Sequence, residues 1–210
     1  GERMAAMAAR GTIDVLIVGA GVNGAGLFRD LTAQGLDCLL IEKNDYAAGT
    51  SAAPSRLIHG GLKYLETGEF RLVAQSTLER NLLLANAPHY VKPLPTLIPI
   101  FSWTKGIGAA LRTLFGSKSA PRSRGALLVK IGLMLYDFYG ARHRVMPRHS
   151  TASRAASLRD LPALTPDIVA TGTYYDATVT HPERLILELV RDGLADSPRS
   201  AALNHVGLER

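Results

Sequence analysis

A glycine-rich turn between two short apolar runs constrains the fold of this chain more than any other feature. Residues 13–18 are mostly apolar, as in a parallel strand buried on both faces, and Gly-Ala-Gly-Val-Asn-Gly follows at 19–24. Gly19 permits a tight turn, Gly21 lets a pyrophosphate approach the backbone, and Gly24 lets the next helix pack closely on the strand. The sequence therefore predicts a strand, turn and helix that bind the phosphates of a dinucleotide.

The second apolar run ends on a carboxylate. Residues 36–41 form this run, and Glu42 follows it, 23 positions after Gly19. A carboxylate at this place can accept hydrogen bonds from ribose hydroxyls, and it disfavours a 2′-phosphate. The pattern predicts a βαβ unit that prefers FAD or NAD to NADP. The alternative is a glycine-rich turn in an ordinary α/β domain.

The composition is that of a globular protein, with 47% hydrophobic and 20% charged residues. No apolar run reaches the roughly 18 residues of a membrane-spanning helix. The single cysteine, Cys38, excludes an intrachain disulfide and favours a reducing compartment. Residues 1–11 lack the apolar core of a signal peptide, so we expect a disordered leader, followed by one domain over 12–210.

The net charge of +6 is spread unevenly. Residues 104–148 hold nine lysines and arginines against one acid, Asp137. We expect a basic insertion at about 104–125 and, because no nucleic-acid motif accompanies the charge, an anionic membrane surface as partner rather than nucleic acid. A solvated basic loop is the alternative. Residues 127–139 are densely apolar and predict either a core helix or a helix that dips into a membrane.

Periodicity and breaker residues predict the remaining elements. Thr180-His181-Pro182-Glu183 is typical of a capping box, and residues 44–54 are predicted as a loop or the start of a helix. The expected elements are helices over 70–87, 127–139 and 181–195, strands over 171–175 and 201–206, and proline-broken extended pieces over 91–103.

Several motifs together resemble the FAD-dependent glycerol-3-phosphate dehydrogenases. The run at 18–26 resembles their opening, although many flavoproteins share it. The specific match is Thr-Ser at 50–51 followed by Ser-Arg-Leu-Ile-His-Gly-Gly-Leu-Lys-Tyr-Leu-Glu at 55–66. Similarity continues at 69–73, 87–89, 132–137, 175–176 and 183–185. The resemblance implies an α/β, Rossmann-type FAD-binding fold of the glycerol-3-phosphate dehydrogenase and amino-acid oxidase kind, present incompletely because family members are at least twice as long.

The resemblance also implies a set of cofactor-binding residues. In the family pattern the glycine turn holds the FAD pyrophosphate and the acid after the second strand holds the adenosine ribose, while a later group lines the path to the isoalloxazine ring. The corresponding residues here are Gly19, Gly21, Asn23 and Gly24 for the pyrophosphate, Glu42 for the ribose, and Thr50, Ser51, Arg56, Leu57, His59 and Gly60 for the path.

Lys63 and Tyr64 match a substrate-binding position where Arg-Tyr is frequent in the family. Lysine keeps the positive charge but loses the bidentate fork, so a phosphate would be held by a point charge. No catalytic residue and no metal site are assigned. His59 is open to two interpretations, a flavin-adjacent role, which we favour, and a general base, because its ordinary pKa lies near neutrality.

The reaction that the resemblance implies is oxidation of sn-glycerol 3-phosphate to dihydroxyacetone phosphate. A hydride leaves the substrate C2 for the flavin, and the electrons then pass to a quinone. The expected location is cytoplasmic, peripheral on the inner face of the cell membrane. Two alternatives are a related FAD amine or hydroxy-acid oxidase and an inactive cofactor-binding fragment, because the chain looks truncated.

Overall fold

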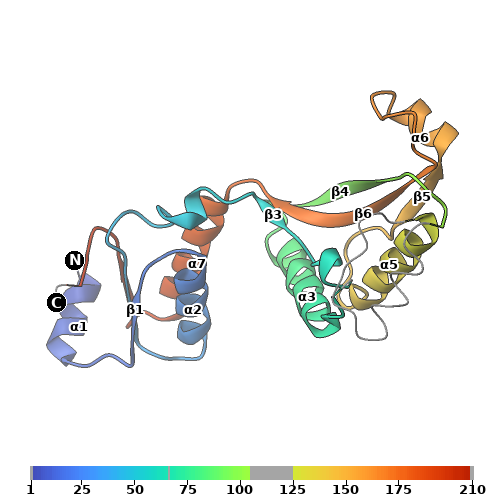
Figure 1. Cartoon of the computed structure of the whole chain (residues 1–210). Coiled ribbons are helices and arrows are strands. Elements are labelled where there is room, and N and C mark those ends of the chain that lie inside the picture. The colour runs from blue at the N-terminus through green and yellow to red at the C-terminus, as the bar shows by residue number, and fades with distance from the viewer. Residues whose placement is uncertain (1, 66, 105–124, 209–210) are drawn as a thin grey trace. The chain divides into compact units, whose positions relative to one another are not determined.

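The computed structural model describes residues 2–65, 67–104 and 125–208, which form two compact units (Figure 1). The first unit comprises Gly1–Arg56 and Val179–Arg210, and the second comprises Leu57–Thr178. Within the stretch predicted as one domain, the second unit is therefore inserted into the first. The basic insertion predicted at about 104–125 lies, apart from its two end residues, outside the described residues.

The first unit is built on a three-stranded parallel sheet in the order β1-β2-β7. Val15 pairs with Cys38, and Leu39 pairs with Ala201. The elements are α1 (Glu2–Arg10), β1 (Val15–Val18), α2 (Val22–Ala33), β2 (Cys38–Ile41), the 3₁₀ turn η1 (Thr50–Ala52), α7 (Pro182–Asp196) and β7 (Ala201–Leu203). The predicted βαβ unit is thus present, and β7 adds a third parallel strand.

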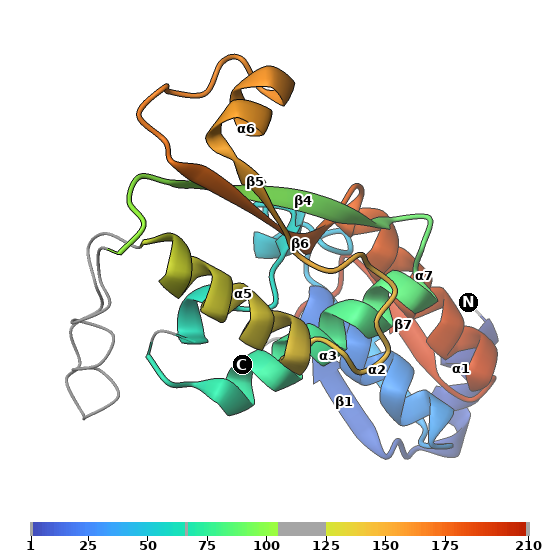
Figure 2. The ribbon, with the colours of Figure 1, turned by 90° about the vertical axis from the view of Figure 1, so that its right-hand side faces the viewer.

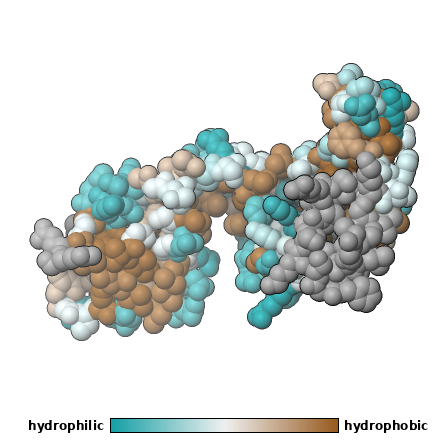
Figure 3. Space-filling view, viewed as in Figure 1, coloured by the Kyte–Doolittle hydropathy of each residue, from teal (hydrophilic) through white to brown (hydrophobic). Residues whose placement is uncertain are grey.

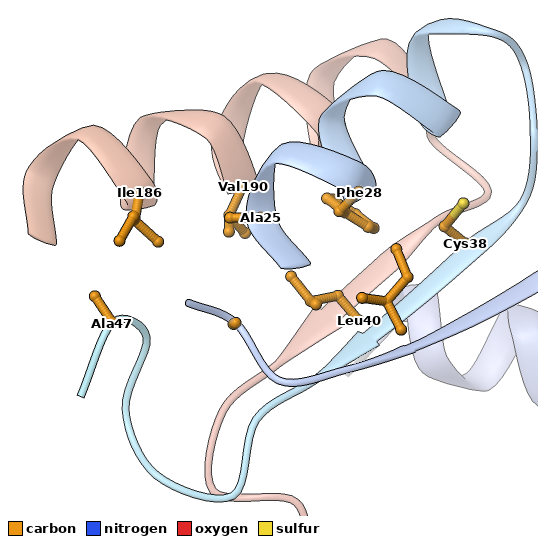
Figure 4. Packing of buried hydrophobic residues seen from close by; sticks show 9 residues of the cluster. Ala25, Phe28, Cys38, Leu40, Ala47, Ile186 and Val190 are labelled. Atoms are coloured by element: carbon orange, nitrogen blue, oxygen red, sulfur yellow. The ribbon is translucent and has the colours of Figure 1, made fainter. Parts of the chain in front are cut away.

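Helices α2 and α7 pack on one face of this sheet (Figure 4). Phe28 of α2 and Val190 of α7 lie over Leu40 of β2, and all three side chains are buried. Side chains alternate along a strand, so Leu16 and Val18 of β1 point to the opposite face, where 44% and 61% of each residue is exposed. Figure 3 shows apolar surface gathered on this unit where β1 lies.

The prediction of a disordered leader at 1–11 is wrong, because residues 2–10 form helix α1. Met7 is buried, and the Arg3 guanidinium donates a hydrogen bond to the Leu194 carbonyl oxygen at 2.8 Å. Arg10 likewise donates to the Arg199 carbonyl oxygen at 2.8 Å. Carbonyl groups in the last turn of α7 and just after it thus order a segment whose own sequence carries only weak tertiary signals.

The second unit is built on a four-stranded sheet in which β6 lies between β3 and β4 and also pairs with β5. The β3–β6 and β5–β6 pairs are antiparallel. The elements are β3 (Leu57–Ile58), the 3₁₀ turn η2 (Leu62–Leu65), α3 (Phe70–Asn86), β4 (Val91–Ile100), α5 (Ala126–Tyr139), β5 (Ser150–Ser153), α6 (Arg154–Asp160) and β6 (Ala170–Val179). Helices α3 and α5 lie on the same side of this sheet (Figure 2).

Two core clusters fasten these helices to the sheet. Leu84 of α3 packs with Val91 and Ala177, and Leu133 of α5 packs with Ile100 and Ala170. The predicted helices over 70–87, 127–139 and 181–195 are present within a residue or two of their expected ends. The prediction that α7 begins with a capping box is wrong. The N-cap residue is His181, whose side chain makes no capping hydrogen bond, and Pro182 lies in the first turn.

The proline-broken pieces predicted over 91–103 are instead one continuous strand, β4. Its three prolines all stand at odd-numbered positions, Pro93, Pro95 and Pro99. Because alternate residues direct their N–H groups to the same edge of a strand, all the missing N–H groups lie along one edge. In the order β3-β6-β4 this strand lies at the end of the sheet, where prolines are tolerated. Strand β5 and helix α6 are not among the elements predicted from the sequence.

Candidate functional site

The glycine turn of the first unit has the geometry that close backbone approach requires. Gly19 adopts a positive φ of 102°, which glycine reaches without strain. A Cβ atom added at Gly24 would lie 1.8 Å from the Gly19 carbonyl oxygen, which is far too close for two atoms that are not bonded to each other. The first turn of α2 therefore lies directly against the end of β1, and its N-terminus faces the turn, as a pyrophosphate site needs.

Ser51 reaches the same helix end from η1. Its hydroxyl oxygen accepts a hydrogen bond from the Val22 amide at 3.1 Å, and a Cβ atom added at Gly21 would lie 3.2 Å from it. Thr50 precedes it in η1, and Asn23 is exposed in the first turn of α2. The structure thus brings residues 50–51 to the glycine turn, although they lie some thirty positions later in the sequence.

Glu42 is fixed at the end of β2 by the backbone. One carboxylate oxygen accepts the Ala20 amide at 2.8 Å, and the other accepts the Asn44 amide at 3.0 Å. These two N–H donors lower the pKa of the carboxyl group below its ordinary value, and the Asn44 amide has the larger effect. Each carboxylate oxygen keeps further lone pairs, so an oriented and ionised acceptor stands beside the glycine turn.

The second unit contains the other group of predicted residues. Leu57 pairs with Thr178 across β3 and β6, and His59 and Gly60 follow in the turn before η2. His59 is exposed, with its ring centroid 6.3 Å from that of Tyr64. Lys63 is exposed on η2. Arg56 closes the first stretch of the first unit with a positive φ of 59°.

The predicted residues thus form one cluster in each unit. The cluster of the first unit holds Gly19, Gly21, Asn23, Gly24, Glu42, Thr50 and Ser51, and that of the second holds Leu57, His59, Gly60, Lys63 and Tyr64, while Arg56 is the residue at which the chain passes from the first unit to the second. Their roles toward FAD and substrate stay predictions. The first cluster nevertheless fits a dinucleotide, because a glycine-rich turn, a helix N-terminus and an ionised carboxylate meet there.

A buried polar cluster in the second unit carries residues to which the sequence analysis gave no role. Arg80 of α3, Tyr136 of α5 and Asp176 of β6 are all nearly inaccessible and hydrogen-bonded to one another. A usable signal was present, since an acid and an arginine interrupt otherwise buried faces of a strand and a helix, and buried charges are seldom unpaired.

The described residues contain neither a cluster of metal ligands nor a helix that could span a membrane. Residues 2–65, 67–104 and 125–208 contain no group of three or more histidines, cysteines and acids arranged to hold a metal ion. No helix in that part of the chain is long and apolar enough to cross a membrane.

Comparison with known proteins assigns the class. The family model of the FAD dependent oxidoreductases (DAO) matches residues 14–196. The chain therefore belongs to the FAD-dependent oxidoreductase family, which confirms the predicted fold class and FAD as the cofactor.

Within this family the similarity is to glycerol-3-phosphate dehydrogenases. The chain is 37% identical over 208 residues to the enzyme of Synechocystis sp., covering 94% of this chain and 32% of the relative. It is 40% identical over 131 residues to the aerobic enzyme of Escherichia coli, covering 62% of this chain and 22% of the relative. A D-erythritol 1-phosphate dehydrogenase of Brucella abortus is also 40% identical, over 139 residues, 66% of this chain and 24% of the relative.

A solved structure shares the fold. The glycerol-3-phosphate dehydrogenase of Bacillus halodurans, complexed with FAD, matches with a TM-score of 0.57 and 21% identity over 99% of this chain and 30% of that one. The chain thus spans about a third or less of the length of these relatives. The predicted resemblance to the glycerol-3-phosphate dehydrogenases is confirmed.

Proposed function

We propose that this chain serves the FAD-dependent oxidation of sn-glycerol 3-phosphate to dihydroxyacetone phosphate. The observation that carries the proposal is the 37% identity, over 94% of the chain, to a protein named glycerol-3-phosphate dehydrogenase. The geometry of the first unit supports it, because the turn at Gly19–Gly24 and the oriented Glu42 suit the pyrophosphate and ribose of the cofactor.

The residues of the chain divide the work in this proposal. FAD, when bound, supplies the acceptor for a hydride from the substrate C2. The glycine turn and Ser51 hold its phosphates, and Glu42 holds its ribose. The exposed ammonium of Lys63 attracts the substrate phosphate, and anchoring the phosphate orients the reacting carbon. His59 lies beside Tyr64, and its imidazole would either border the bound flavin or take the hydroxyl proton of the substrate.

Substrate-dependent bleaching of the bound flavin tests this function. The purified, FAD-loaded protein is mixed under anaerobic conditions with sn-glycerol 3-phosphate, D-erythritol 1-phosphate, an amino acid or a 2-hydroxy acid. We expect bleaching with glycerol 3-phosphate. Bleaching by the amino or hydroxy acid alone indicates a related oxidase, and bound but unbleached flavin indicates a cofactor-binding segment. Either result contradicts the proposal.

We propose further that the protein attaches to the cytoplasmic face of an anionic membrane and delivers electrons to a quinone there. Helix α5 supports this attachment, because its exposed apolar residues recur at helical spacing along one face: Leu127, Ile131, Met134 and Phe138. Lys130 is exposed on the same helix, and Arg142 and Arg148 are exposed just after it. An apolar face beside cations is the pattern of a helix lying in the interface of an anionic membrane.

A further inference from the structure

The buried cluster of the second unit converges on one carboxylate oxygen. Oδ1 of Asp176 accepts hydrogen bonds from the Tyr136 hydroxyl at 2.5 Å, the Gly60 amide at 2.9 Å and the Arg80 guanidinium at 3.1 Å. Only 4% of the Arg80 side chain and 3% of the Asp176 side chain are exposed. The backbone amide of the turn before η2 is therefore tied to an ion pair sealed inside this unit.

The donors around Asp176 hold one another in place. The Arg80 guanidinium also donates to the Tyr136 hydroxyl oxygen at 2.6 Å and to the Tyr175 carbonyl oxygen at 3.0 Å. Its second terminal nitrogen donates to the Asn81 side chain at 3.2 Å. Burial raises the pKa of Tyr136, so its hydroxyl stays protonated and keeps a hydrogen to donate. The carboxylate thus has a single orientation.

The turn itself is shaped to meet the cluster. A Cβ atom at Gly60 would lie 2.2 Å from the Tyr136 hydroxyl oxygen and 2.8 Å from the Arg80 Nη1 atom. Gly61 adopts a positive φ of 77°, and a Cβ atom there would lie 2.6 Å from the Tyr64 ring. The backbone of these two glycines therefore lies directly on the cluster on one side and on Tyr64 on the other.

A buried ion pair is an expensive way to stabilise a fold, since apolar side chains of similar volume often do as well or better. An ion pair whose carboxylate accepts a hydrogen bond from the main chain can orient that N–H group. Apolar packing cannot do this, because only a fixed acceptor aligns an N–H group. This hydrogen bond is made by Gly60, which lies in the sequence between His59 and the predicted substrate-binding residues Lys63 and Tyr64.

We propose that Asp176, oriented by Arg80 and Tyr136, is a positioning residue that fixes the turn at His59–Gly61 for the bound flavin. The inference rests on the proposed function, in which this turn lines the path to the isoalloxazine ring. It adds that the alignment of the turn comes from β6, α3 and α5, more than 70 positions away in sequence for two of the three groups.

Amide exchange and FAD titration on folded variants test the inference. The variants are Asp176→Asn, which weakens the acceptor, and Tyr136→Phe, which removes one donor and leaves the ion pair intact. The matched control is Ser157→Ala, because Ser157 is buried in the same unit and bonds Thr171 at 2.8 Å, but does not contact Gly60. Exchange of the Gly60 amide is read by NMR, and FAD affinity by quenching of flavin fluorescence.

We expect Gly60 exchange in Asp176→Asn to rise at least about tenfold, as loss of a hydrogen bond to a charged group implies, and less in Tyr136→Phe. FAD affinity should fall in the same order and stay unchanged in Ser157→Ala. If Asp176→Asn does not fold, Tyr136→Phe alone decides. Equal Gly60 exchange in variants and control, or FAD affinity lowered equally in all three, overturns the inference. A parent chain without FAD affinity contradicts the proposed function instead, and Gly60 exchange still decides whether the cluster holds the turn.

Discussion

The carbonyl oxygen of Gly19 occupies the space where residue 24 would place a side chain, with 1.8 Å between that oxygen and an added Cβ atom. This contact makes the last glycine of the turn a packing requirement. Strand β1 and helix α2 can approach each other this closely only because residue 24 has no side chain.

Gly24→Ala should therefore destabilise the first unit and weaken FAD binding together. Overpacking of this kind typically costs about 1–3 kcal/mol. Thermal unfolding and FAD titration of the variant give both quantities. The control is Gly26→Ala in the same helix, where nothing lies within 4 Å of an added Cβ atom. Alanine there should be neutral or stabilising by up to about 1 kcal/mol, and equal losses in both variants would contradict the assigned packing.

Glu42 should make stability depend on pH in the acid range. Its pKa in the folded state is lowered by the Asn44 and Ala20 amides, so its contribution is fully present above the unfolded-state pKa of about 4.5. The contribution is lost as the pH falls through the lower folded-state value. The difference in unfolding free energy between parent and Glu42→Gln should thus be largest near neutrality and shrink below pH about 4.5. If the difference in unfolding free energy stays constant from pH about 3 to pH about 7, Glu42 does not have this role.

Lys63→Ala should raise the Michaelis constant for glycerol 3-phosphate more than it weakens FAD binding, measured in a full-length homologue carrying this segment. Loss of a charge-assisted contact predicts a rise of at least about tenfold. Lys63→Arg should restore binding, because arginine keeps the charge and adds a second donor. Lys92→Ala, at an exposed lysine of β4, is the control. An unchanged Michaelis constant with reduced flavin content would instead place Lys63 in the cofactor site.

Helix α5 should determine attachment to anionic vesicles. Replacing Met134 and Phe138 with serine removes two residues of the exposed apolar face and should reduce co-sedimentation, whereas Leu161→Ser, at an exposed apolar site after α6, should not. Binding of the parent should fall from low to physiological salt, because the attraction of its cations is screened. Equal binding to neutral and anionic lipid, or none to either, refutes the membrane proposal.

The parts of the fold that could be predicted from sequence are those whose signals are local. The β1-α2-β2 unit lies within about thirty residues and carries its glycines and its acid at fixed offsets, so Gly19, Gly24 and Glu42 fall where expected. The long helices were predicted from periodicity for the same reason. Helix α1 was missed because its order comes from carbonyl groups almost two hundred positions away.

The candidate site was predictable only in pieces. The motif after residue 50 predicts which residues gather, but the contact of Ser51 with the Val22 amide depends on how η1 returns to α2. The link from Gly60 to Asp176 spans 116 positions and needs the antiparallel pairing of β3 with β6. Such contacts follow from topology, and no local pattern encodes them.

The second unit begins at Leu57 and ends at Thr178, and these two residues are register partners in β3 and β6. The chain therefore leaves and re-enters the nucleotide-binding unit through neighbouring strands, about 5 Å apart. An excursion whose two ends are already joined can be lengthened, shortened or exchanged without disturbing the strands that carry the glycine turn. Evolution can thus revise the second unit as one continuous stretch of sequence, while the parallel strands of the first unit keep their order and pairing.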